Sequence, residues 1–101
     1  MKYNKLIRDK IPEILDTKGK KYTTHIAGNE EYSKKLLEKL QEEVDEFKDE
    51  PNQEELADIL EVIDAICNFK NFDKKEIANI KSKKTRDRGA FKKKIILEEV
   101  K

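Results

Sequence analysis

Two acidic, helix-prone stretches meet at a single proline, and this arrangement constrains the fold more than any other feature of the chain. The sequence reads EEVDEF shortly before Pro51 and EELAD shortly after it. On a helix, residues three apart share a face, so Glu43 lies with Glu46 and Glu55 lies with Asp58. Because proline interrupts a helix and a short break favours antiparallel neighbours, we expect a helical hairpin here.

An antiparallel hairpin would bring the four carboxylates together. Pairing Glu46 with Glu55 also pairs Glu43 with Asp58, because each step back along the first helix matches a step forward along the second. Acids gathered in one small volume repel each other unless protons or cations neutralise them. Carboxylate oxygens are hard ligands that suit Mg²⁺ or Mn²⁺, so the pairing predicts a metal site.

The same residues also fit a plainer interpretation. Charged residues make up 45% of the chain, so an EExxE pattern on a solvated helix face is expected by chance. Glu55 also fits a capping box with Asn52, which is an ordinary signature of a helix start. The neighbouring residues distinguish the two interpretations.

Apolar residues recur at helical spacing through most of the chain. The pattern predicts a short helix with Pro12 in its first turn, a helix over 29–48 with Asn29 as its N-cap, and a capped helix over 74–87. The stretch over 53–70 differs, because apolar residues cover most of its circumference and predict burial on several sides. A carboxylate on such a helix needs a partner or a metal, which favours the metal interpretation.

Together these stretches predict an all-α fold, a small antiparallel bundle of about four helices in a single domain over 1–101. Only 36% of the residues are apolar and the mean hydropathy is −0.94, which is lean for a self-sufficient core. The helix over 53–70 is apolar on more sides than its own chain can cover, so we expect a homodimer or homotetramer. A β-prone run at Ile95–Leu97 is expected to pair with a partner chain or to pack extended against the bundle.

Composition excludes several classes of function. The net charge of +1 predicts neither nucleic-acid nor membrane binding. Cys67 is the only cysteine, which leaves no intramolecular disulfide and no cysteine-based zinc site, and we expect it to be a buried apolar residue. We find no signal peptide, no bilayer-spanning run and no Gly-rich phosphate loop. We therefore expect a cytoplasmic protein that is not a P-loop ATPase.

Three motifs resemble those of a known family. The acidic segments 42–46 and 55–58 resemble the EExxE…ExxD signature of the all-α nucleoside triphosphate pyrophosphohydrolases. This MazG-like superfamily includes phosphoribosyl-ATP pyrophosphohydrolase and dimeric dUTPases. The opening YNKLIRDKIP over 3–12 and the pattern KxxxRGxF over 84–91 are similar to one small subgroup of it. The three motifs together span nearly the whole chain.

The resemblance implies a Mg²⁺-dependent enzyme that cleaves a nucleoside triphosphate, or a nucleotide like phosphoribosyl-ATP, between its α- and β-phosphates to give a monophosphate and pyrophosphate. It implies a set of metal ligands with Glu42 assisting: Glu43, Glu46, Glu55 and Asp58. Of these, Glu43 and Glu46 are the catalytic candidates. The gap between Glu46 and Glu55 is shorter than in many relatives, which predicts a tight hairpin and a minimal family member.

Basic residues lie at both ends of the chain, where they could hold the substrate phosphates. Cleavage of a phosphoanhydride needs charge neutralisation and a positioned water, and cationic side chains hold the pyrophosphate portion. Lys5 and Arg8 are candidates near the start, and Lys84 and Arg88 near the end, with Arg88 preferred for its planar fork beside a helix end. The plainer alternative is that Lys84 and Arg88 only complement the helix dipole.

Two other functions stay open at this stage. The basic segment 81–94, KSKKTRDRGAFKKK, fits a non-catalytic nucleic-acid-binding or regulatory module in which Phe91 stacks on a base. Against this, the run holds one aromatic residue and no recognition-helix pattern, so nucleic acid is not the expected partner. A purely structural, self-associating helical protein would leave the pairing of the acids unexplained.

Overall fold

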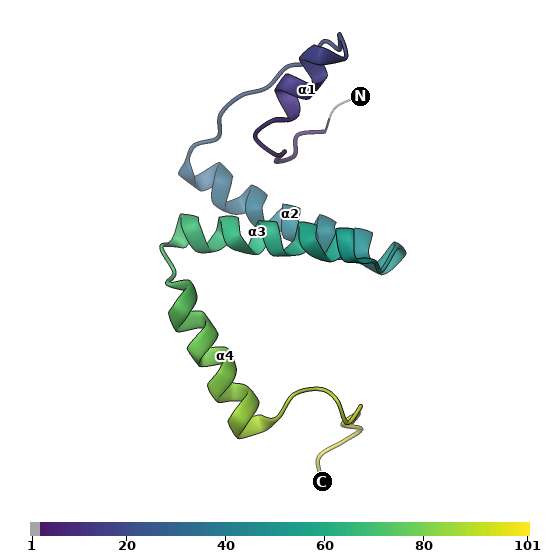
Figure 1. Cartoon of the computed structure of the whole chain (residues 1–101), viewed down its shortest axis with the longest axis vertical. Coiled ribbons are helices and arrows are strands. Elements are labelled where there is room, and N and C mark those ends of the chain that lie inside the picture. Colours follow the sequence, from purple (N-terminus) through teal and green to yellow (C-terminus); the bar gives the residue numbers. More distant parts are fainter. Residues whose placement is uncertain (1–2) are drawn as a thin grey trace. The chain divides into compact units, whose positions relative to one another are not determined.

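The computed structural model describes residues 3–101, and within this range the chain is helical or irregular, with no strand. The helices are α1 (Ile11–Thr17), α2 (Asn29–Asp49), α3 (Gln53–Lys70) and α4 (Lys74–Arg88) (Figure 1). The all-α prediction is therefore confirmed. The chain forms two compact units, Met1–Lys70 and Asn71–Lys101. The expectation of a single domain over 1–101 stays a prediction.

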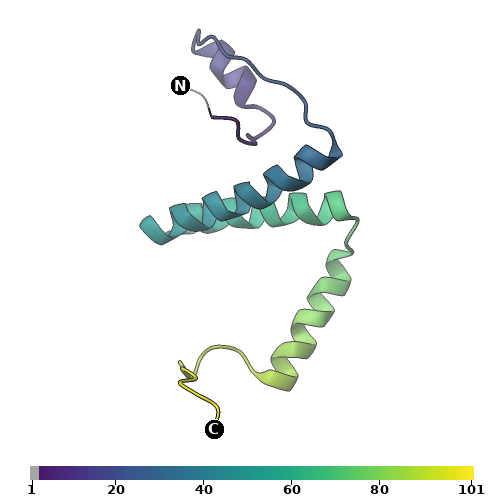
Figure 2. The same cartoon turned by 180° about the vertical axis from the view of Figure 1, so that it is seen from behind.

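The helices α2 and α3 form the antiparallel hairpin predicted around Pro51. They lie side by side along their lengths in both views (Figures 1 and 2). The side chain of Asn52 ends the connection, since its Oδ1 accepts a 2.9 Å hydrogen bond from the backbone N–H of Glu55. This bond satisfies one of the free N–H groups at the start of α3. The hairpin prediction is thus confirmed, and of the predicted capping box only the bond to the Asn52 side chain forms, since the backbone N–H of Asn52 donates to the carbonyl of Glu50.

A small core fixes how the two helices align. Its buried apolar side chains are Leu36, Val62 and Cys67. The ring of Tyr32 packs edge to face on that of Phe69, with centroids 5.0 Å apart and planes at 89°. Tyr32 lies as many residues before Glu43 as Phe69 lies after Asp58. The aromatic contact and the acids therefore share one alignment of α2 against α3.

The N-terminal elements follow the sequence closely, with one correction. Pro12 lies in the first turn of α1, as predicted. The prediction that Asn29 is the N-cap of α2 is wrong: Asn29 is the first helical residue, and Gly28 is the N-cap without a side-chain capping bond. Gly28 has the extended backbone that an N-cap needs, and the acids Glu30 and Glu31 complement the helix dipole in the first turn.

In the second unit, α4 has the capped start that the sequence predicts. The carboxylate of Asp73 accepts a 2.8 Å hydrogen bond from the backbone N–H of Lys75. Gly89, with a positive φ of 85°, ends the helix. The run Ile95–Leu97 is irregular and exposed, and its pairing with a partner chain stays a prediction.

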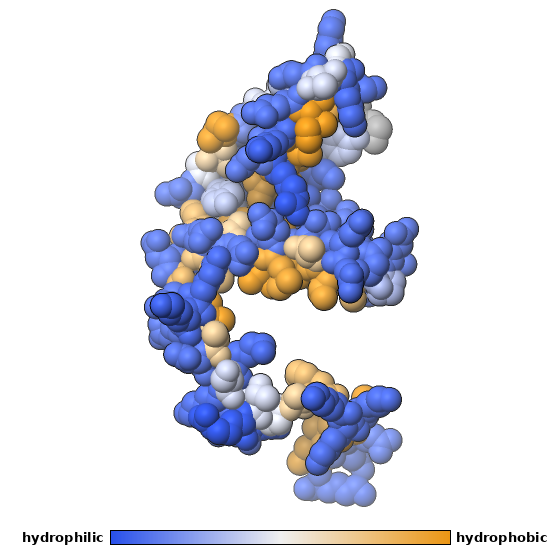
Figure 3. Space-filling view, in the orientation of Figure 1, coloured by the Kyte–Doolittle hydropathy of each residue, from blue (hydrophilic) through white to orange (hydrophobic). Residues whose placement is uncertain are grey.

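Part of the apolar surface of α3 is uncovered. Leu56, Leu60 and Ile63 keep 47%, 56% and 40% of their surface exposed. Figure 3 shows hydrophobic side chains gathered along the α2–α3 pair. Among the described helices, none is long and apolar enough to cross a membrane. The core is small, as the composition predicts, and apolar side chains of α3 therefore remain exposed.

Candidate metal centre

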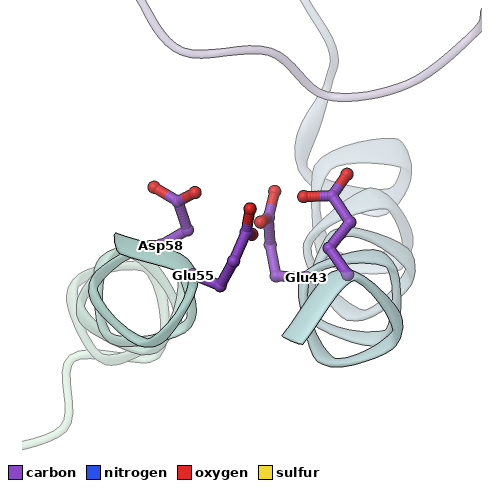
Figure 4. Close-up of side chains that lie close together, drawn as sticks. Glu43, Glu55 and Asp58 are labelled. Carbon is purple, nitrogen blue, oxygen red and sulfur yellow. The ribbon is translucent and has the colours of Figure 1, made fainter. Parts of the chain in front are cut away.

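The carboxylates that the sequence predicts to converge lie together in the structure. One oxygen from each of four acids lies within 4.8 Å of the others: Glu43, Glu46, Glu55 and Asp58. Two come from α2 and two from α3, so the site exists only because the hairpin aligns the helices. Figure 4 shows Glu43, Glu55 and Asp58 directed to the same side of the helix pair. The predicted convergence of the four acids is confirmed.

The cluster is buried at one end and open at the other. Glu43 is only 6% exposed, Glu55 and Asp58 are half-buried, and Glu46 is exposed. The Oε2 atoms of Glu43 and Glu55 are buried, and neither has a hydrogen-bond partner within residues 3–101. A buried carboxylate oxygen without a partner is costly, so these two atoms distinguish the cluster from a solvated helix face.

The donor set fits a hard divalent cation. Magnesium binds oxygen at about 2.1 Å, so ligands on opposite sides of the ion lie about 4.2 Å apart. The four oxygens lie within 4.8 Å of one another, so flexible side chains can bring them around a single ion. Because all the donors are carboxylates, Mg²⁺ or Mn²⁺ is favoured over softer metals.

Lys39, which the sequence analysis did not identify, lies beside the cluster. Its Nζ is 3.3 Å from Oε1 of Glu43 and 3.5 Å from Oε2 of Glu42, and its side chain is 17% exposed. Burial raises the pKa of Glu43 above its ordinary value; Glu46 acts in the same direction and Lys39 opposes it. In the sequence, the i,i+4 spacing of Lys39 and Glu43 could have indicated this contact. Such pairs are common in a chain this rich in charge, so the spacing did not single it out.

Glu42 lies outside the group of four acids. Its carboxylate accepts a 3.0 Å hydrogen bond from Nζ of Lys5 and also contacts Lys39. Burial alone would raise the pKa of Glu42, but the hydrogen bond from Lys5 and the charge of Lys39 outweigh it and hold that pKa below its ordinary value. Glu42 therefore holds the side chains of Lys5 and Lys39 beside the cluster. Its assistance in metal binding stays a prediction.

The N-terminal residues chosen as phosphate ligands also lie at the cluster. Nη2 of Arg8 is 2.7 Å from Oδ1 of Asp58, and Lys5 contacts Glu42 as described. Nζ of Lys35 donates a 2.7 Å hydrogen bond to the backbone carbonyl of Asn4. In this structure both side chains contact carboxylates, and their binding to substrate phosphates stays a prediction.

The C-terminal candidates belong to the second unit. Lys84 lies within α4, and Arg88 is its last residue, directly before Gly89. Both side chains are exposed. Their binding to substrate phosphates stays a prediction.

Comparisons of the chain with protein-family models, with curated proteins and with solved structures give no match. The resemblance in the three motifs is therefore an indication from the residues alone.

Proposed function

We propose that this chain is a divalent-cation-dependent nucleotide pyrophosphohydrolase. It would cleave a nucleoside triphosphate, or a related nucleotide such as phosphoribosyl-ATP, between the α- and β-phosphates. The observation that carries the proposal is the four-carboxylate cluster with two buried, unpartnered oxygens. Mg²⁺ is the cation that these donors suit best, and Mn²⁺ is a close substitute.

The burial of each acid suggests whether it holds the cation or accepts a proton. Glu43, Glu55 and Asp58 are the less exposed members and would hold the cation together with Glu46. When bound, the cation would neutralise phosphate oxygens and lower the pKa of a water. Glu46 is the exposed member, so its second oxygen is open to accept the proton of the attacking water. A new phosphorus–oxygen bond forms, the bond to the bridging oxygen breaks, and pyrophosphate leaves.

Cationic side chains would hold the leaving pyrophosphate, where negative charge develops. Lys5 and Arg8 already lie at the rim of the cluster. The hydrogen bond to Glu42 raises the pKa of Lys5 above its ordinary value, so Lys5 remains fully cationic at neutral pH. Lys84 and Arg88 of α4 are the further candidates for this role.

The direct test is pyrophosphate release from a panel of nucleotides, with Mg²⁺ and with a chelator. We expect release that requires Mg²⁺ and that Glu55→Gln abolishes. Glu54→Gln is the matched control, because it removes the same charge from the neighbouring exposed position, outside the cluster. The absence of release from every nucleotide, with Mg²⁺ or Mn²⁺, would refute the proposal.

A further inference from the structure

Residues 4–8, here called the N-terminal strap, connect to both helices of the hairpin beside the acids. A hydrogen bond of 2.7 Å from Lys35 holds the carbonyl of Asn4, and Lys5 pairs with Glu42, so the strap is tied to α2 at two points. Arg8 ties it to α3 through Asp58. Figure 4 shows the N-terminal segment, in pale purple, passing on the side to which the carboxylates point.

The cations of the strap reach only the rim of the cluster. Arg8 contacts Asp58, whereas the Oε2 atoms of Glu43 and Glu55 keep no partner in the described chain. The strap therefore neutralises part of the negative charge and leaves these two buried oxygens without a partner. A divalent cation bound among the four acids would give these oxygens a partner.

The contact between Arg8 and Asp58 is easily broken. The two side chains are 57% and 38% exposed, and exposed ion pairs contribute little to stability. The guanidinium cannot lose its proton, so it is a fixed positive charge. If Asp58 joined a divalent cation while keeping Arg8, two cations would lie within a few ångströms of each other and would repel.

We propose that Arg8 is an exchange residue: it neutralises Asp58 in the metal-free protein, leaves Asp58 when a divalent cation binds, and then pairs with a substrate phosphate. The displacement requires only cation binding, whereas the transfer to phosphate rests on the proposed function. By linkage, the cation and the phosphate ligand strengthen each other's binding, because the phosphate gives the displaced guanidinium a new partner.

The test measures binding of Mn²⁺ alone to the full chain, from the paramagnetic resonance signal of the free ion. Arg8→Gln removes the competing charge, so we expect the affinity for Mn²⁺ to rise about three-fold. With Mg²⁺ present, we expect the affinity of the same variant for pyrophosphate to fall about ten-fold, because a charged hydrogen bond is lost. Lys10→Gln, which removes the same charge just beyond the strap, is expected to change neither affinity.

A second measurement needs no variant protein. In the wild-type chain labelled with ¹⁵N-arginine, the side-chain Hε resonance of Arg8 is expected to move as Mg²⁺ is added. The move should be towards the position of an unpaired guanidinium, and pyrophosphate should then shift it again. If the chemical shift of this resonance stayed unchanged at a saturating concentration of Mg²⁺, the displacement of Arg8 would be contradicted.

The possible failures are distinguishable. If the wild-type chain binds Mn²⁺ but Arg8→Gln binds it equally or more weakly, the exchange is refuted and the proposed function stands. An equal rise in affinity with Lys10→Gln would also refute it, because the effect would then be one of overall charge. If the wild-type chain binds no Mn²⁺, the proposed function fails, and the exchange fails with it.

Discussion

At the scale of single residues, Glu43 carries the most information, because it is buried, charged and only partly paired. Lys39 contacts one of its oxygens, and the other has no partner in the described chain. Local spacing predicted Glu43 as a site residue. The contact of Arg8 with Asp58 was not predictable, because it joins residues fifty positions apart with no periodic pattern between them.

Replacing Glu43 should separate metal binding from stability. We expect Glu43→Gln to leave the free energy of unfolding of the metal-free protein unchanged, or to raise it by up to about 1 kcal/mol, because repulsion within the cluster falls. Mg²⁺ at a hundred times its dissociation constant should add about 2.7 kcal/mol to the wild type and almost nothing to the variant. Urea unfolding with and without Mg²⁺ measures both effects. If Mg²⁺ stabilised the variant as much as the wild type, Glu43 would not be a metal ligand.

Lys39 should matter for the metal-free fold. Lys39→Met keeps a long side chain but removes the cation beside Glu43, so a buried carboxylate loses its partner. We expect the free energy of unfolding to fall by about 1–3 kcal/mol at neutral pH. Lys34→Met, at an exposed position of the same helix, is the control and should change it little. Equal effects of the two changes in thermal melts would show that the contact with Glu43 is not stabilising.

At the scale of elements, the helices were predictable because their signals are local. Apolar spacing, Pro51 and the cap residues each act within a few positions, and the bounds of α2 and α3 follow from them except at the start of α2, where Gly28 and not Asn29 is the N-cap. The convergence of the acids was predictable for the same reason, because a short connection fixes which residues face each other. The position of the N-terminal strap was not, since it depends on contacts distant in sequence.

The cap of α3 offers a test at this scale. Asn52→Ala removes the acceptor for the N–H of Glu55, so we expect a loss of about 1 kcal/mol in the free energy of unfolding. Asn52→Asp restores an acceptor and should recover most of it. Denaturant titration of the three proteins measures the series. If alanine and aspartate behaved alike, the side-chain bond would not be what starts the helix.

At the scale of the whole molecule, the open face of α3 predicts self-association. Leu56, Leu60 and Ile63 are too exposed for an isolated chain with so few buried apolar residues. We expect light scattering at micromolar concentration to give at least twice the chain mass of 11.9 kDa. Leu60→Glu should shift the protein to the monomer, because burying a charge in an apolar contact is costly. A wild-type chain that is monomeric under these conditions would contradict the prediction.

The basic residues of α4 are tested by kinetics. If Arg88 holds the pyrophosphate as it leaves, Arg88→Ala should lower kcat/KM by about 10²-fold, since each 1.36 kcal/mol of lost stabilisation is a factor of ten. Lys93→Ala, in the irregular tail, should have almost no effect. Small and equal effects of both changes would indicate that the basic segment is solvated surface.

The connection between α2 and α3 has a consequence for how such a chain can vary. Tyr32 with Phe69 and the two pairs of acids all depend on the same alignment, and that alignment is set by the few residues around Pro51. One residue inserted there would turn one helix by about 100° relative to its partner, given 3.6 residues per turn. The helices could still pair by sliding, yet the acids would no longer meet. The length of this turn therefore determines the acidic cluster as much as any carboxylate does, and the turn should tolerate substitution far better than insertion or deletion.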